Sequence, residues 1–205
     1  MREQFLDSGR YVRGQWKKFL TVAGIFILLA AATAWAMVLH PDQAQEMMGI
    51  LQENMGRVMD EEGNIQLFRL FVNNLSVAGL GVLMGFIPFL AAPLYIILTN
   101  GIVIGVVYGA YLTMADALTV PVWKIMLVGI LPHGIFELGA IFLSVALGLQ
   151  LCFQLSKKIL GRANRSLKEE LIDLGWAFVL WVTPMLLLAA VIECFLTPIL
   201  MELLL

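Results

Sequence analysis

The sequence has little charge and little cysteine. Asp, Glu, Lys and Arg make up 14% of its 205 residues, whereas about 25% is usual for a soluble domain. The formal net charge of −2 gives no indication of nucleic-acid binding, and we expect no nucleic-acid partner. The two cysteines, Cys152 and Cys194, lie in apolar runs without a Cys-x-x-Cys or Cys/His metal spacing. We therefore interpret them as small buried hydrophobic residues, not as a disulfide or a metal site.

The sequence also lacks the common catalytic motifs. It contains no G-x-S-x-G nucleophile turn, no phosphate-binding loop, no H-E-x-x-H zinc motif and no lipidation motif. His133 and Glu137 are candidates for acid–base chemistry, but no serine or cysteine is evidently paired with them. We therefore expect no enzyme activity, no catalytic residue and no cofactor other than a metal ion.

Apolar residues are in excess, at 60% of the chain against about 45–50% in soluble domains. They form several runs, and about 20 apolar residues suffice to cross a hydrocarbon core of about 30 Å. The sequence thus predicts an all-α polytopic membrane protein with a single membrane domain, 1–205, built from about five transmembrane helices broken by prolines. The predicted spans are residues 19–39, 67–90, 93–114, 122–153 and 174–198.

The start of the chain allows alternatives. Residues 1–18 interleave basic and apolar side chains, so they form either a short amphipathic helix on the membrane surface or a basic flank of the first span. Ala34-Trp35-Ala36 resembles a signal-peptide cleavage site. The preceding apolar stretch is longer than the about 7–15 residues of a signal peptide, which favours a retained span.

The distribution of lysine and arginine predicts the orientation. Of 13 such residues, five lie in 1–18 and five in 157–168, which is ten of the total. Basic loops stay on the cytoplasmic side. We therefore expect the N-terminus and the loop 154–172 inside, and an exposed acidic segment, 40–66, and the C-terminus outside.

Prolines and small residues mark the spans. The prolines in or beside them are Pro88, Pro93, Pro132, Pro184 and Pro198, which either kink the helices or divide them into half-helices that expose their ends to ions. Glycines recur four residues apart at Gly81 and Gly85, and at Gly101, Gly105 and Gly109. Such faces let helices approach closely, either within one bundle or in a homodimer.

Polar residues inside the apolar runs are the most informative signal. They are Asn73, Asn74, Asn100, His133, Glu137, Thr183 and Glu193. An ionisable side chain within a membrane costs about 2.5–3.5 kcal/mol on insertion scales, so it usually pairs or lines a cavity.

His133 and Glu137 are four residues apart and share one face of a helix, and Pro132 suits a first helical turn. Three interpretations stay open: polar packing, a proton or ion pathway, and a metal site with Glu193 as third ligand. Straight helices place His133 about 15 Å from Trp123 and near the midplane, but Glu193 nearer the outer face. A shared site therefore requires a broken or shortened helix.

The residues Leu131-Pro132-His133-Gly134-Ile135-Phe136-Glu137-Leu138, together with Asn73-Asn74, Asn100-Gly101-x-x-x-Gly105 and Ile192-Glu193, resemble the stage II sporulation protein M family. The resemblance implies a multi-pass helical protein of the bacterial cytoplasmic membrane, and the family's namesake has no hydrolase activity assigned to it. The family's namesake acts during engulfment in endospore formation, in a complex with two peptidoglycan-degrading proteins. The resemblance therefore implies a scaffold that anchors membrane or cell-wall proteins, and the polar residues suggest a transporter or channel-like protein as the alternative.

Overall fold

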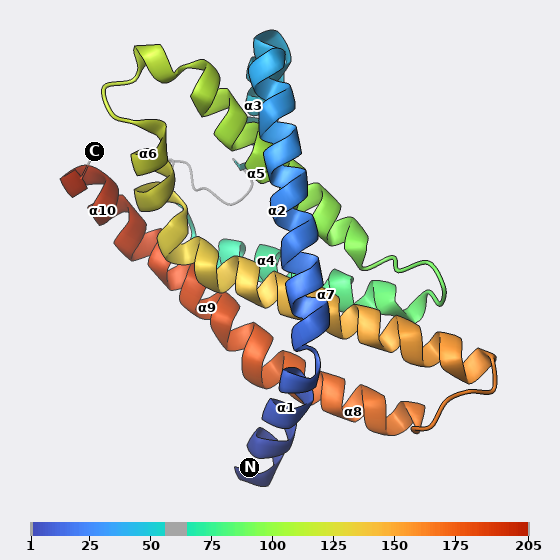
Figure 1. Ribbon diagram of the computed structural model, residues 1–205. Coiled ribbons are helices and arrows are strands. Elements are labelled where there is room, and N and C mark those ends of the chain that lie inside the picture. Colours follow the sequence, from blue (N-terminus) through green and yellow to red (C-terminus); the bar gives the residue numbers. More distant parts are fainter. Residues whose placement is uncertain (1, 56–64, 205) are drawn as a thin grey trace.

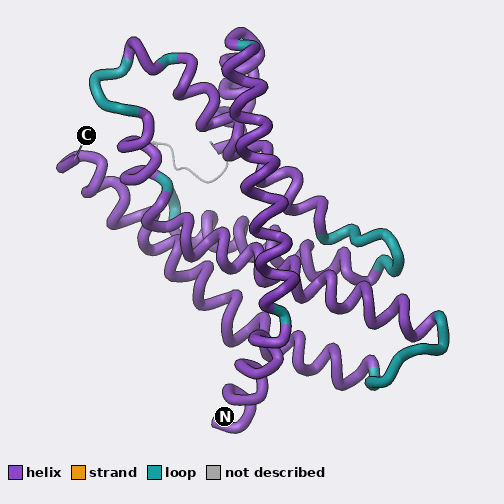
Figure 2. Tube along the Cα trace, viewed as in Figure 1, coloured by secondary structure: helices purple, strands orange, loops and turns teal. Residues whose placement is uncertain are grey.

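The computed structural model describes residues 2–55 and 65–204, and the regular elements in these ranges are helices (Figures 1 and 2). In chain order they are α1 (Arg2–Gly14), α2 (Trp16–Leu39), α3 (Pro41–Met55), α4 (Leu67–Leu83), α5 (Leu94–Thr113), α6 (Val122–Gly129), α7 (Leu131–Ile159), α8 (Leu167–Ala177), α9 (Thr183–Val191) and α10 (Thr197–Leu204), with short 3-10 turns at Met84–Phe86 and Ala115–Ala117. Within the described residues, five helices are long and apolar enough to cross a membrane: Trp16–Leu39, Leu67–Phe86, Leu94–Thr113, Leu131–Ile159 and Leu167–Leu204. The prediction of an all-α polytopic membrane protein is confirmed.

Helix α7 is the centre of the bundle. In its most apolar stretch 72% of the residues are buried, against 22–39% for the other four candidate spans. One side of α7 packs with α4, α8 and α9 around Leu147 and Leu186, which are fully buried. Its other side packs with α2 and α5 around Ile97 and Val145. Every other candidate span therefore contacts the helix that carries His133 (Figure 1).

The predicted span 122–153 is two helices rather than one. The chain turns at Ile130, and Figure 1 shows α6 lying at an angle to α7. The physical reason is Pro132, because proline has no N–H and its ring clashes with the carbonyl four residues earlier. At the second position of a new helix that N–H is not needed. Helical bonding restarts where the Gly134 N–H donates to the Ile130 carbonyl, at 2.8 Å.

The prolines of the last span bend the helix without ending it. Pro184 and Pro198 each follow a wide π-helical turn, Phe178–Val182 and Ile192–Leu196. In both places the residue before the proline donates its N–H to the carbonyl five residues earlier, so helical hydrogen bonding continues up to the proline. Helices α8, α9 and α10 therefore run on as one rod, Leu167–Leu204.

All five recurring glycines lie at contacts between helices of the same chain. Gly81 and Gly85 face α7, whereas Gly101, Gly105 and Gly109 face α2. The α2–α5 approach is so close that a Cβ at Gly105 would lie 2.6 Å from the Ala30 carbonyl oxygen. At Gly109 it would lie 2.8 Å from the Ala34 oxygen. Because these faces are used within the chain, a homodimer would need another surface.

Helix α1 is docked on α8. The Tyr11 hydroxyl donates to a Glu170 carboxylate oxygen at 2.5 Å, and Arg165 Nη1 donates to the other oxygen at 3.1 Å. Glu170 is only 1% exposed. A second contact is made by Trp181, whose Nε1 donates to Ser8 Oγ at 3.2 Å. Burial, reinforced by the bond to Glu170, raises the pKa of Tyr11, so the phenol stays a donor. The two basic segments of the sequence thus meet at one end of the bundle.

The acidic segment begins with α3, which packs through Ala44 against Val106 and Ala110 of α5. Its carboxylates, Asp42, Glu46 and Glu53, are exposed. The rest of the acidic segment, 56–64, lies outside the described residues. Cys152 is buried and Cys194 half-buried, and both are free thiols.

Candidate functional site

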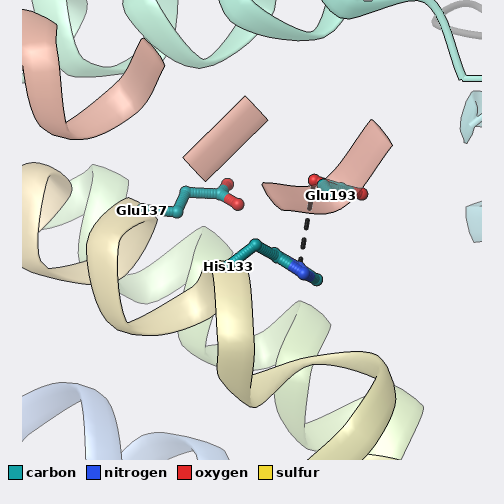
Figure 3. Close-up of side chains that lie close together, drawn as sticks. All are labelled: His133, Glu137 and Glu193. Carbon is teal, nitrogen blue, oxygen red and sulfur yellow. Dashed lines mark ion pairs between the residues drawn. The ribbon is translucent and has the colours of Figure 1, made fainter. Parts of the chain in front are cut away.

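The site is built from two helices that are distant in sequence. His133 and Glu137 stand one turn apart at the start of α7, where Pro132 fixes the first turn. Glu193 comes from the second wide turn of the α8–α10 rod. Figure 3 shows the two α7 side chains reaching toward Glu193.

The three side chains come close enough to act as a unit. His133 Nε2 lies 3.9 Å from Glu193 Oε2, and one ligand atom from each of His133, Glu137 and Glu193 lies within 4.8 Å of the other two. The side chains of His133 and Glu193 are 11% and 15% exposed. Glu137 makes no hydrogen bond and no ion pair with any residue in 2–55 and 65–204. The sequence suggested this set, and the fold brings it together.

The charges of the site demand compensation. Two carboxylates at this separation repel strongly where the dielectric constant is low, so both cannot carry charge unless a cation is present. Imidazolium, protons or a metal ion can supply that positive charge. The arrangement could therefore bind a cation, and the chemistry of the ligands would decide which cation it prefers.

Thr197 is a fourth member of the site and is not among the residues predicted from the sequence. Its Oγ1 lies 3.4 Å from His133 Nδ1, and which atom donates depends on the tautomer of the imidazole. The sequence does contain an indication of its role, since Thr197 is four residues after Glu193 and therefore on the same helical face. It also precedes Pro198 as Thr183 precedes Pro184. Thr183 has a different use, because its hydroxyl donates to the Phe178 carbonyl in the first wide turn.

The three asparagines that interrupt the apolar runs are Asn73, Asn74 and Asn100. In the described part of the chain they form no hydrogen bond with this site. Asn100 donates to the carbonyl of Ile96 in its own helix, at 2.8 Å. Asn73 donates to Asn74, whose own Nδ2 is buried without a partner.

Helices α4 and α7 run side by side, with Gly81 against Ser144 and Gly85 against Gly148. Extending this register back along α4 places Asn74 about level with Glu137. Asn73 and Asn74 thus lie at about the level of the site along the bundle, although neither forms a hydrogen bond with it.

The position of the site along the axis of the bundle differs from the position estimated for straight helices. His133 lies 26 residues before the end of α7 (159 − 133), and Glu193 lies 26 residues after the start of α8 (193 − 167). At 1.5 Å per residue both stand about 39 Å from the α7–α8 connection. They meet because they are equally far from this connection. A distance counted from Trp123 does not measure depth, because α6 does not continue α7. The site lies toward the α6–α10 end of the bundle, not at the middle of α7.

Comparison with known proteins agrees with the residues of this region. The family model described as stage II sporulation protein M matches residues 20–198. The chain belongs to the stage II sporulation protein M family. The match spans all four residues of the site, and the family suggested by the Pro132-to-Glu137 element is confirmed.

One relative is similar over a shorter stretch of the chain. It is the uncharacterized protein MJ0793 of Methanocaldococcus jannaschii, 31% identical over 129 residues, which are 63% of this chain and 69% of the relative. No solved structure matches the chain. The family match and the five candidate spans together make this a multi-pass membrane protein of the stage II sporulation protein M family.

Proposed function

We propose that this protein is transporter-like and carries a cation, as protons or as a metal ion, through the His133–Glu137–Glu193 site. The observation that carries the proposal is the convergence of one imidazole and two carboxylates from different helices, within 4.8 Å, in an apolar bundle. Such residues are rare in membrane spans and usually mark ion or proton pathways. The proposal assigns no catalytic residue and places the protein in the bacterial cytoplasmic membrane.

The helices around the site support this use. His133 stands in the first turn of α7, directly after the break at Ile130, and Glu193 stands in a wide turn, so irregular backbone adjoins the site on both helices. Irregular helices beside polar groups are the usual construction of ion sites in transporters. Wide turns in helices are also frequent at functional sites.

Proteoliposomes test the proposal. The full chain is reconstituted with a pH-sensitive dye inside, and a potassium diffusion potential drives proton entry; a parallel set carries a Zn²⁺-sensitive dye. We expect flux of one of these cations above that of empty liposomes. Because Glu137→Gln removes one of two carboxylates, we expect it to lower this flux at least tenfold.

Asp116→Asn is the matched control, since Asp116 is an exposed carboxylate in the turn after α5 and should leave flux unchanged. The proposal would be contradicted if wild-type protein gave no more flux of either cation than empty liposomes. Flux that Glu137→Gln leaves intact would contradict it as well.

A second candidate, anchoring of partner proteins at the membrane, is favoured by the family match over residues 20–198. In this role the protein holds membrane or cell-wall proteins together, as in engulfment, and the exposed carboxylates of α3 offer a charged surface. Purification from native membranes in mild detergent tests it. We expect stoichiometric partner proteins, and recovery as an isolated protomer or a homodimer would count against anchoring.

A further inference from the structure

We propose that His133, Glu137 and Glu193 bind one first-row divalent transition-metal ion, of which Zn²⁺ is the representative. The inference deepens the proposed function and rests on it, in that it assigns the cation of the same site. It can nevertheless be tested by equilibrium binding, without any flux. Its basis is the ligand set, the geometry, the charge balance and the contact of Thr197.

The ligand atoms select the class of metal. The site offers one imidazole nitrogen and two carboxylate oxygens. Ca²⁺ and Mg²⁺ are bound by oxygen ligands, so an imidazole argues against them. A site without thiolate does not favour Cu(I), whereas imidazole with carboxylate suits Zn²⁺ and its neighbours. Cys194 follows Glu193 directly, but the set of converging ligand atoms does not include its sulfur.

The geometry needs only small adjustments. Zinc–nitrogen and zinc–oxygen distances of about 2.0–2.2 Å in a tetrahedron place ligand atoms about 3.3 Å apart. The atoms now lie within 4.8 Å of one another, so the widest pair must approach by about 1.5 Å. Rotation about the long glutamate side chains covers this distance. Three protein ligands leave the fourth position open, as in sites that exchange a ligand.

The charge balance favours a divalent ion. Glu137 has no hydrogen-bond or ion-pair partner within the described ranges, and Glu193 has only His133, at 3.9 Å. Two carboxylates and a neutral imidazole with one divalent cation sum to zero charge. A neutral assembly is what a poorly solvated part of the bundle tolerates best.

Thr197 orients the imidazole. A metal-binding histidine usually engages its second ring nitrogen in a hydrogen bond, which fixes the tautomer. Thr197 Oγ1 is 3.4 Å from His133 Nδ1, which leaves Nε2 on the side of Glu193. Thr197 is therefore a positioning residue in this proposal.

The experiment measures metal binding by the purified full chain in lipid nanodiscs, without a histidine tag. Co²⁺ serves as the spectroscopic probe and Zn²⁺ as the competitor, and bound zinc is counted after gel filtration. We expect one equivalent of zinc per chain and a visible Co²⁺ absorption that Zn²⁺ removes and excess Mg²⁺ does not. X-ray absorption of the zinc-loaded wild type should show nitrogen and oxygen ligands without sulfur.

Variants identify the ligands. His133→Gln and Glu193→Gln should each weaken binding at least tenfold, and Thr197→Val should weaken it less. His40→Gln is the matched control, because His40 is the other histidine of the chain and is exposed at the end of α2. It should bind as the wild type does, and so should Cys194→Ser.

The outcomes separate this inference from transport. Wild-type protein that retains no zinc overturns the inference, whatever its variants do, and proton flux could then still support the proposed function. A sulfur ligand, or binding that His133→Gln leaves unchanged, also overturns it. Zinc that is bound through these residues in a protein without flux upholds the inference and contradicts transport.

Discussion

Replacing Gly148 by alanine should destabilise the protein by about 3 kcal/mol or more, at the upper end of the range for overpacked cores. A Cβ at this position would overlap the backbone carbonyl of Gly81 and lie 3.0 Å from Pro93 Cγ. Backbone cannot move aside as a flexible side chain can, so α4 and α7 must separate. Because α7 is the most buried candidate span, this separation should disturb the whole bundle.

Thermal unfolding in detergent, followed by tryptophan fluorescence and gel filtration, measures this effect. Gly79→Ala is the matched control on α4, since no atom lies within 4 Å of the added Cβ. It should unfold at the wild-type temperature or slightly above, because alanine favours helix over glycine. Equal unfolding temperatures for Gly148→Ala and Gly79→Ala would contradict the close α4–α7 approach.

Replacing Arg165 by alanine should destabilise the docking of α1 by about 2 kcal/mol. Removing one partner of a fully buried ion pair costs about 3–5 kcal/mol, and partial exposure lowers this value. Arg165 is 36% exposed, but its partner Glu170 is 1% exposed and would keep the Tyr11 hydroxyl as its one hydrogen-bond donor among the described side chains. Arg165 also bonds Asp173 and lies 3.8 Å from Glu169, so one side chain joins three carboxylates.

Limited proteolysis of residues 2–14 and thermal unfolding report on this docking. Arg162→Ala is the matched control, because Arg162 is an exposed arginine of the same loop. Arg165→Lys should recover only part of the loss, since a lysine cannot bridge several carboxylates as the planar guanidinium does. Release of α1 to the same extent by Arg162→Ala would show that net charge, not this network, holds α1.

Length and composition were sufficient to predict the five helices, because the cost of lipid-exposed backbone leaves few alternatives for long apolar runs. The break at Ile130 was harder to foresee. Pro132 shows that a helix begins nearby, but nothing in the sequence gives the direction of the chain before it. The docking of α1 could not be predicted, since Tyr11 and Glu170 are 159 residues apart and meet only in the folded chain.

The candidate site was predictable in composition but not in position. The four-residue spacing of His133 and Glu137 places them on one face, and Glu193 is the remaining acid in the last apolar run. Depth counted along straight helices separates them, because it treats residues 122–153 as one rod. The contact of Thr197 with His133 was not predictable, because threonine hydroxyls in helices usually donate to their own backbone, as that of Thr183 does.

The two wide turns of the α8–α10 rod also determine the rotation of α10 about the helix axis. Each wide turn holds one residue more than an α-helical turn, so every later side chain is rotated by about 100° relative to an unbroken α-helix. The second turn contains Glu193, and Thr197 follows at its end. Deleting a single residue there would restore regular helix and swing α10 around its axis. The alignment of Thr197 with His133 thus depends on one surplus residue in the chain.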